Sequence, residues 1–136
     1  MKILILHGPN TNLIGLRSLK NNKKITLDKI NQEIRKYNRN TNLNIKIIQT
    51  NKEDNAITYI QNNRNKINGI IITPGPWQSS AFILKDLLEL TQIPFITISY
   101  NEKNKPNLLN GFKNIYKNDI LLSYKTAIEQ MIKNLT

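Results

Sequence analysis

Four short apolar runs, separated by amphipathic stretches, constrain the fold of this chain more than any other feature. The runs cover residues 2–7, 44–48, 69–73 and 94–98. Continuous apolar runs of this length predict strands buried on both faces, as in a parallel sheet that helices cover on both sides. We therefore expect one α/β domain over residues 1–136, with a three-layer, doubly wound parallel sheet.

The stretches between these runs carry apolar side chains at helical spacing. Thr26 is placed to cap a helix whose apolar stripe begins at Leu27 and reaches Tyr37. Residues 101–119 are polar, and the run Ile120-Leu121-Leu122 after them is predicted as a short fifth strand. Further helices are predicted over 53–65, from 79–80 to just before 94, and through 124–135. This order of strands and helices resembles that of flavodoxin.

The loop after the first strand is the strongest sign of a ligand site. It runs from Gly8 to Arg17 with the sequence Gly-Pro-Asn-Thr-Asn-Leu-Ile-Gly-Leu-Arg. Gly and Pro set the turn, the Asn side chains can hydrogen-bond to backbone or to a ligand, and Arg17 offers a fixed cationic fork. Ligands of doubly wound sheets bind beyond the carboxyl ends of the strands. The loops expected to line the site are therefore 8–24, 49–53, 73–79 and 99–107.

Composition narrows the range of partners. The chain has no Cys and one His, His7, which excludes disulfides, thiolate chemistry and a multi-His metal site. We expect no metal and no cofactor. The net charge of +11 would suit nucleic acid, but the Lys residues are spread along the chain without aromatic interleaving. A small anionic substrate benefits from the same field, so we expect such a substrate and no nucleic acid.

Targeting signals are not evident in the sequence. No apolar run approaches membrane-spanning length, and Met1-Lys2 leads directly into the first strand rather than into a signal peptide. The lack of Cys fits a reducing compartment. We expect a cytoplasmic protein with no membrane partner.

Five further motifs follow the first loop in order along almost the whole chain. They are Gln49-Thr50-Asn51-Lys52-Glu53, Ile70-Ile71-Ile72-Thr73-Pro74-Gly75-Pro76-Trp77, Leu84-Lys85-Asp86, Ile93-Pro94-Phe95-Ile96 and Tyr124-Lys125-Thr126-Ala127-Ile128-Glu129. Each is weak alone. Together and in register, they resemble type II 3-dehydroquinate dehydratases, whose first loop runs N/H-G-P-N-x-N-L-x-G-x-R.

The resemblance implies removal of water from 3-dehydroquinate. In that family a proton next to the ketone is abstracted, and the leaving hydroxyl is then protonated. The base is a lid Tyr activated by the Arg of the first loop, the acid is a His after the fourth strand, and an Asn of the first loop helps to hold the enolate through water. Arg17 and Asn12 match the Arg and the Asn of this pattern, so we expect both to be catalytic.

Two catalytic positions depart from the family pattern. Asn22 stands at the position of the lid Tyr and Ser99 at that of the His, with Thr97 in place of the family's Glu. An Asn amide has no proton-accepting character near neutral pH, and a Ser hydroxyl is far too weak an acid to replace an imidazolium. What remains is binding and electrostatic stabilisation, which Arg17 and Asn12 can supply.

The expected substrate-binding residues lie in the same loops. Ser79 stands where the family has a substrate-contacting His, and Thr73 where it has the Asn before Pro-Gly. The counterpart of Asp86 reaches a neighbouring subunit's site in family members, which form trimers that pack into dodecamers. We therefore expect a homo-oligomer. The full set of expected substrate-binding residues is Asn10, Thr73, Gly75, Ser79, Asp86, Ser99 and Asn101.

Some of these residues have structural alternatives. Asn10 and Asn12 could serve only to cap and staple the loop. Asp86 could be a surface charge that pairs with Lys85 or with a neighbouring subunit. Trp77 is better explained by packing or subunit contact than by stacking on a ligand.

Replacements for the missing acid and base can also be named. His7 at the mouth could donate a proton, although His residues at strand ends are more often held by backbone groups. Lys20, Lys23 or Lys24 could act as the base if burial lowered the pKa of the amine.

Three functions are compatible with these patterns. The first is a diverged type II 3-dehydroquinate dehydratase, and the second is a catalytically silent relative kept for binding or assembly. The third, an unrelated flavodoxin-like module, is disfavoured. A response regulator needs acidic residues where His7 and Thr73 stand, and a flavodoxin needs a Ser/Thr-rich phosphate loop where Gly8-Pro9-Asn10 stands.

Overall fold

Five parallel strands form one sheet in the order β2-β1-β3-β4-β5. The computed structural model describes residues 1–18, 24–101 and 104–136. The strands are β1 (Lys2–His7), β2 (Asn44–Gln49), β3 (Gly69–Thr73), β4 (Phe95–Ser99) and β5 (Lys113–Tyr116). The order reverses direction between β1 and β3, as in flavodoxin-like sheets, and this confirms the predicted fold class.

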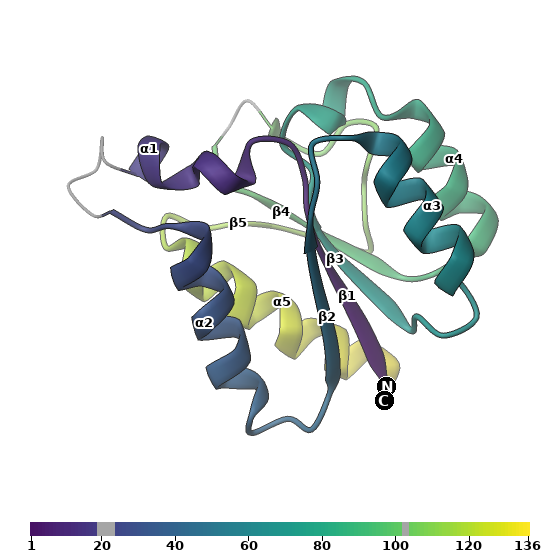
Figure 1. Ribbon diagram of the computed structural model, residues 1–136. Coiled ribbons are helices and arrows are strands. Elements are labelled where there is room, and N and C mark those ends of the chain that lie inside the picture. Colours follow the sequence, from purple (N-terminus) through teal and green to yellow (C-terminus); the bar gives the residue numbers. More distant parts are fainter. Residues whose placement is uncertain (19–23, 102–103) are drawn as a thin grey trace.

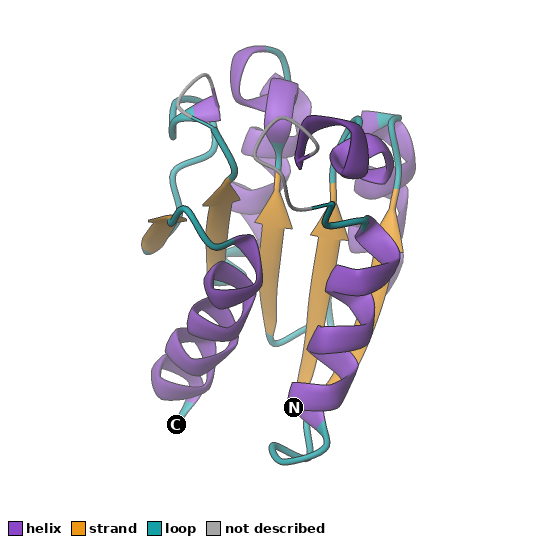
Figure 2. Ribbon diagram, turned by 90° about the vertical axis from the view of Figure 1, so that its left-hand side faces the viewer, coloured by secondary structure: helices purple, strands orange, loops and turns teal. Residues whose placement is uncertain are grey.

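Helices cover both faces of the sheet. On one face lie α2 (Leu27–Asn38) and α5 (Ile120–Leu135), and on the other α3 (Glu53–Asn63) and α4 (Phe82–Thr91) (Figure 1). The strands all point to one edge, where the loops gather, while both chain ends lie at the opposite edge (Figure 2). No helix of the described segments is long and apolar enough to cross a membrane.

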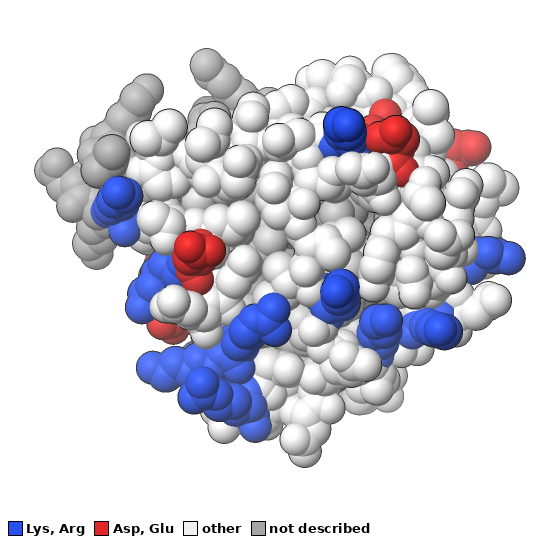
Figure 3. Space-filling view, in the orientation of Figure 1, with Lys and Arg blue, Asp and Glu red and all other residues white. Residues whose placement is uncertain are grey.

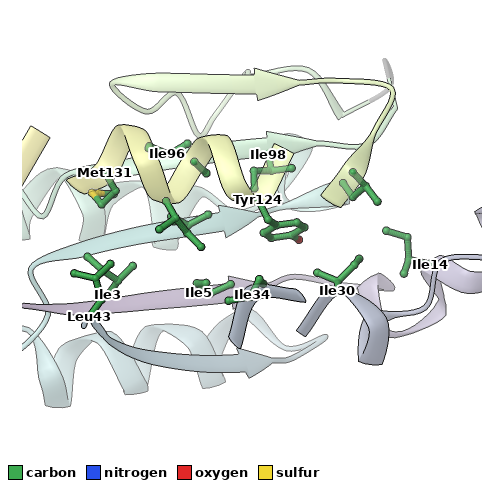
Figure 4. Close-up of a cluster of buried hydrophobic side chains, with 14 residues drawn as sticks. Ile3, Ile5, Ile14, Ile30, Ile34, Leu43, Ile96, Ile98, Tyr124 and Met131 are labelled. Atoms are coloured by element: carbon green, nitrogen blue, oxygen red, sulfur yellow. The ribbon is translucent and has the colours of Figure 1, made fainter. Parts of the chain in front are cut away.

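Alternating strand residues divide the core into two clusters. Ile3 and Ile5 of β1 face α2 and α5, whereas Leu4 and Leu6 face α3 and α4. Figure 4 shows the first cluster, in which Tyr124 of α5 lies among the isoleucines of the sheet. The three inner strands β1, β3 and β4 are thus buried on both faces, as their continuous apolar sequences predict. The prediction is wrong for β2, whose residues are exposed or half-buried because it lies at an edge of the sheet.

The predicted fifth strand at Ile120-Leu121-Leu122 is wrong, because these residues begin α5. The Asp119 side chain accepts hydrogen bonds from the amides of Leu121 and Leu122, so it caps the helix. The actual β5, Lys113–Tyr116, has the sequence Lys-Asn-Ile-Tyr and mostly exposed side chains. It lies at the sheet edge and pairs only with β4, so it needs no apolar run.

A single side chain organises the polar stretch between β4 and β5. Gln78, which is 2% exposed, accepts hydrogen bonds from the amides of Asn107 and Leu109 and donates one to the Leu109 carbonyl. Leu109 is fully buried in the cluster under α3 and α4. The stretch is therefore anchored to the α3 and α4 side of the sheet by Gln78 and Leu109.

Candidate functional site

The exits of β1 and β3 are joined by a close backbone contact. The Gly8 amide donates to the Thr73 carbonyl at 2.9 Å. A Cβ atom on Gly8 would lie 2.7 Å from that oxygen and 2.9 Å from the Pro74 carbonyl, so only Gly fits without a backbone shift. The first loop therefore begins in direct contact with the start of the loop after β3.

Gly75 extends this contact to the exit of β4. It is buried with a φ of 53°, a conformation that strongly favours Gly. A Cβ there would lie 3.3 Å from both the Pro9 carbonyl and the Tyr100 hydroxyl. The loops after β1, β3 and β4 therefore converge at one edge, as the sequence predicted.

The loop after β2 fastens the first loop from its other side. The Asn51 side-chain carbonyl accepts hydrogen bonds from the Asn10 amide and from the Gln49 side chain, both at 3.1 Å. Gln49 also donates to the Gly8 carbonyl at 3.3 Å. Asn10 has a φ of 67°, a left-handed conformation that Asn adopts more readily than most residues. The backbone of Asn10 thus has a structural role, while the residue itself is exposed.

The two expected catalytic residues follow in the same segment. Asn12 is exposed in the short 3-10 turn η1 (Thr11–Leu13), and Arg17 lies on the short helix α1 (Ile14–Ser18). The side chain of Arg17 is outside the described part of the structure. Asn22, Lys20 and Lys23 also lie outside the described residues, while Lys24 is exposed at the start of the next segment.

His7 is fully buried in a chain of polar side chains beneath the loops. Its Nε2 lies 2.9 Å from the Asn31 side-chain oxygen, and its Nδ1 lies 3.1 Å from the Tyr124 hydroxyl. The Thr73 hydroxyl lies 2.6 Å from the same Tyr124 oxygen. His7 is thus held by two side chains rather than by backbone groups. It does not open onto the mouth of the site.

The hydrogen bonds of this chain all run in one direction. Because the Asn31 oxygen can only accept, His7 Nε2 donates, and the neutral ring then accepts from Tyr124 at Nδ1. Tyr124 in turn accepts from Thr73. Burial lowers the pKa of His7 to about 4, although the Asn31 hydrogen bond raises it, so the ring is neutral near pH 7. Burial likewise raises the pKa of Tyr124.

Ser99, at the position of the expected acid, is used to close the following loop. It is 3% exposed, and its hydroxyl donates to the Asn104 carbonyl at 2.7 Å. The Asn101 side chain accepts from the Asn104 amide at 3.2 Å. Thr97, two residues earlier on β4, donates to the Asn114 side chain at 2.6 Å. These polar groups therefore hold the segments after β4 in place.

The remaining expected residues are placed differently from one another. Ser79 is exposed at the end of the 3-10 turn η3 (Gly75–Ser79), whereas Trp77 in the same turn is 4% exposed and packs in the core. Asp86 is exposed on α4. The alternative of a Lys85 partner for Asp86 is wrong, because Lys85 pairs with Glu89 one turn along the helix, 3.3 Å away.

Glu53 has a structural role that the sequence did not reveal. Its carboxylate accepts a hydrogen bond from the Leu84 amide at 3.0 Å, so α3 supplies a cap to the first turn of α4. Gln78 and Tyr100 were also missed, since both act through contacts with residues distant in the sequence. The sequence offered only indirect signals of their positions in the site. Gln78 follows a Pro-Gly turn, and Tyr100 follows the end of a strand.

The visible cluster of basic side chains and a surface groove both lie away from the edge where the loops converge. Lys and Arg side chains gather around the end of α2 and the start of β1 and β2, away from the loop edge (Figure 3). A groove of about 310 Å³ lies between α2 and α5, with Ile34, Tyr37 and Ile128 among its lining residues. In the described segments, no three His, Asp or Glu residues are grouped to hold a metal.

Comparison with known proteins identifies the family. The dehydroquinase class II model matches residues 1–108. A 3-dehydroquinate dehydratase of Halothermothrix orenii is 32% identical over 104 residues, or 76% of this chain and 70% of the relative. One of Buchnera aphidicola subsp. Acyrthosiphon pisum is 36% identical over 98 residues, or 72% and 65% of the two chains.

The fold comparison agrees. The crystal structure of type II dehydroquinase from Butyrivibrio crossotus superimposes with a TM-score of 0.83 at 24% identity, covering 97% of each chain. This likeness shows that the two chains share the α/β fold with a parallel sheet. This chain belongs to the dehydroquinase class II family.

Proposed function

We propose that the chain is a type II 3-dehydroquinate dehydratase, which converts 3-dehydroquinate to 3-dehydroshikimate and water in aromatic amino-acid biosynthesis. Family membership supports this assignment. The observation that carries it is the convergence of the Gly8, Gly75 and Tyr100 segments at the carboxyl edge of the sheet. Asn12 and Arg17 directly follow the first of these segments.

The proposed chemistry begins with the proton next to the substrate ketone. Transfer of this proton to a base, for which Lys24 at the end of the first loop is the candidate among the described residues, places negative charge on the ketone oxygen as an enolate forms. Arg17 and Asn12 stabilise that charge. Because the charge develops only as the enolate forms, this stabilisation lowers the barrier of the reaction. The surrounding loops supply the proposed substrate-binding residues Asn10, Gly75, Ser79 and Asn101.

Steady-state turnover tests the proposal. The purified full chain is mixed with 3-dehydroquinate, and the conjugated enone product is followed by its ultraviolet absorbance. We expect saturable formation of product. Absence of product at high enzyme concentration would overturn the assignment.

A second candidate is a binding relative without turnover. The observation in its favour is that the hydroxyls of Ser99 and Thr73 are both engaged in internal hydrogen bonds, while His7 is buried and neutral. Calorimetric titration with 3-dehydroquinate separates the two functions. Heat of binding without product would favour the silent relative, and product formation would exclude it.

We also propose that the protein works as a trimer-based homo-oligomer in the cytoplasm. On α4, Phe82, Ile83 and Leu90 are 64%, 65% and 74% exposed on the helix that carries Asp86. An apolar surface of this kind favours contact with another subunit. Sedimentation at micromolar concentration should show an oligomer that Leu90→Glu dissociates, whereas Leu122→Glu on α5 leaves it intact. A monomeric wild type would contradict this proposal.

A further inference from the structure

The segment between β1 and α2 carries both Asn12 and Arg17, and a side-chain hydrogen bond joins the two elements at its ends. His7, the last residue of β1, donates from Nε2 to the side-chain oxygen of Asn31 in α2, over 2.9 Å. His7 is fully buried and Asn31 is half-buried, so the bond is largely shielded from water. It therefore fixes the first turns of α2 against the end of β1.

The short helix α1, which carries Arg17, rests on the same part of α2. Ile14 at the start of α1 and Ile30 of α2 belong to one buried cluster (Figure 4). A Cβ atom on Gly15 would lie 3.2 Å from the methyl group of Thr26, the residue that caps α2. Arg17 follows two residues later, so its position depends on where the start of α2 lies.

The other nitrogen of the His7 ring connects this bond to the exit of β3. Nδ1 accepts from the Tyr124 hydroxyl at 3.1 Å, and Tyr124 accepts from the Thr73 hydroxyl at 2.6 Å. His7 and Thr73 are paired neighbours at the ends of β1 and β3. A buried network whose members all have partners makes the elements that it joins more rigid. This network therefore sets α2 relative to the loops that line the site.

We propose that Asn31 and His7 are positioning residues that hold α1, and with it Arg17, at the converging loops. This inference rests on the proposed dehydratase function, in which Arg17 stabilises the enolate. His7 is buried beneath the loops, so its effect on the reaction passes through α2 and α1. A displacement of about 1 Å in a group that acts on the transition state can lower the rate by about 10²-fold, so loss of the hydrogen bond should be visible in turnover.

Asn31→Leu tests the proposal, because it removes the acceptor and keeps a side chain of similar size. We expect kcat to fall by about 10–100-fold with a smaller change in KM, because Arg17 acts on charge that develops in the transition state. Asn31→Asp keeps an oxygen for His7 and should recover most of the lost kcat at mildly alkaline pH, where the ring stays neutral beside the new carboxylate. Gln32→Leu, exposed on the same helix, is the matched control and should turn over normally.

A double-mutant cycle with Arg17 separates positioning from a general loss of structure. In the Arg17→Ala background, Asn31→Leu should lower the residual kcat by less than about 2-fold, because the group that it positions is already gone. An equal loss with and without Arg17 would overturn the proposal.

The hydrogen bond can also be measured without turnover, since His7 is the one His of the sequence. In protein labelled with ¹⁵N-histidine, Nε2 should carry the proton, and Asn31→Leu should move that proton signal upfield while Gln32→Leu leaves it in place. A signal that Asn31→Leu leaves unmoved would overturn the proposal. Normal turnover by Asn31→Leu with a moved signal would also overturn it and leave the dehydratase function standing. A wild type without turnover would refute both.

Discussion

The two sides of the candidate site are built in different ways. The exits of β1 and β3 are locked by backbone contacts at Gly8 and Gly75, in motifs that resemble those of dehydroquinases. The exit of β4 is instead held by side chains, with Ser99 and Gln78 fixing the segment that follows. The family match ends at residue 108, within that segment. The first side thus keeps the family's sequence pattern, while the second departs from it at Ser99.

This difference suggests a division of labour. The first side carries Asn12 and Arg17, which suit binding and charge stabilisation. The second side lacks the expected His and has Ser99 in its place. A site can thus keep the residues that stabilise charge while the residues that transfer protons change.

Arg17→Ala tests the first side with the largest expected effect. Loss of one electrostatic stabiliser lowers kcat by about 10²–10³-fold. Arg39→Ala, an exposed Arg at the end of α2, is the control and should leave kcat unchanged. Wild-type turnover that is indifferent to Arg17→Ala would mean that the first side does not stabilise the charge.

Gly8→Ala tests the backbone lock. The new Cβ meets two carbonyl oxygens that cannot move without shifting β3, so we expect the free energy of unfolding to fall by about 3 kcal/mol. The control is Gly15→Ala, whose Cβ would lie 3.2 Å from the Thr26 side chain and 3.8 Å from the Lys24 side chain and the Thr26 backbone, with no carbonyl oxygen among these neighbours. Urea denaturation measures both. Equal stability of the two variants would contradict a tight contact at Gly8.

The pH dependence of stability tests the buried chain beneath the first side. The pKa of His7 is about 4 in the folded protein against 6.5 for an unperturbed His, so the unfolded chain binds the proton first as pH falls. This contribution to stability is present above pH 6.5 and is lost toward pH 4, by up to about 3 kcal/mol. His7→Asn, which keeps an acceptor for Tyr124, should flatten the slope. An unchanged slope in that variant would exclude His7 as its source.

Gln78→Ala tests the second side, where we expect a smaller effect on stability. It leaves the amides of Asn107 and Leu109 without their acceptor, which costs about 2 kcal/mol. Hydrogen exchange at these two amides should accelerate, while amides of β1 and β3 stay protected. Gln61→Ala, on the exposed face of α3, should change neither. Uniform acceleration across the sheet would show that the two sides are not independent.

The fold was more predictable from sequence than the site. Strands β1, β3 and β4 are buried on both faces and edge strand β2 is partly buried, so all four have apolar runs that predict strands. The polar edge strand β5 carries no such signal. A short apolar run such as Ile120-Leu121-Leu122 fits a strand or a helix, and the Asp119 cap decides between them.

Within the site, the turn residues Gly8 and Gly75 allowed the positions of the loops to be predicted from the sequence. The chain from Thr73 through Tyr124 to His7 could not be predicted, because His7 and Tyr124 are 117 residues apart and meet only in the folded sheet.

The central claim is that the substrate binds at the converging loops. The chain has five glycines, whose amide signals report where a ligand binds. In the protein labelled with ¹⁵N-glycine, titration with 3-dehydroshikimate should shift the amide signals of Gly8 and Gly75. Gly69, which begins β3 at the opposite edge, should stay unmoved. A shift at Gly69 with Gly8 and Gly75 unchanged would place the ligand away from the converging loops and contradict the account.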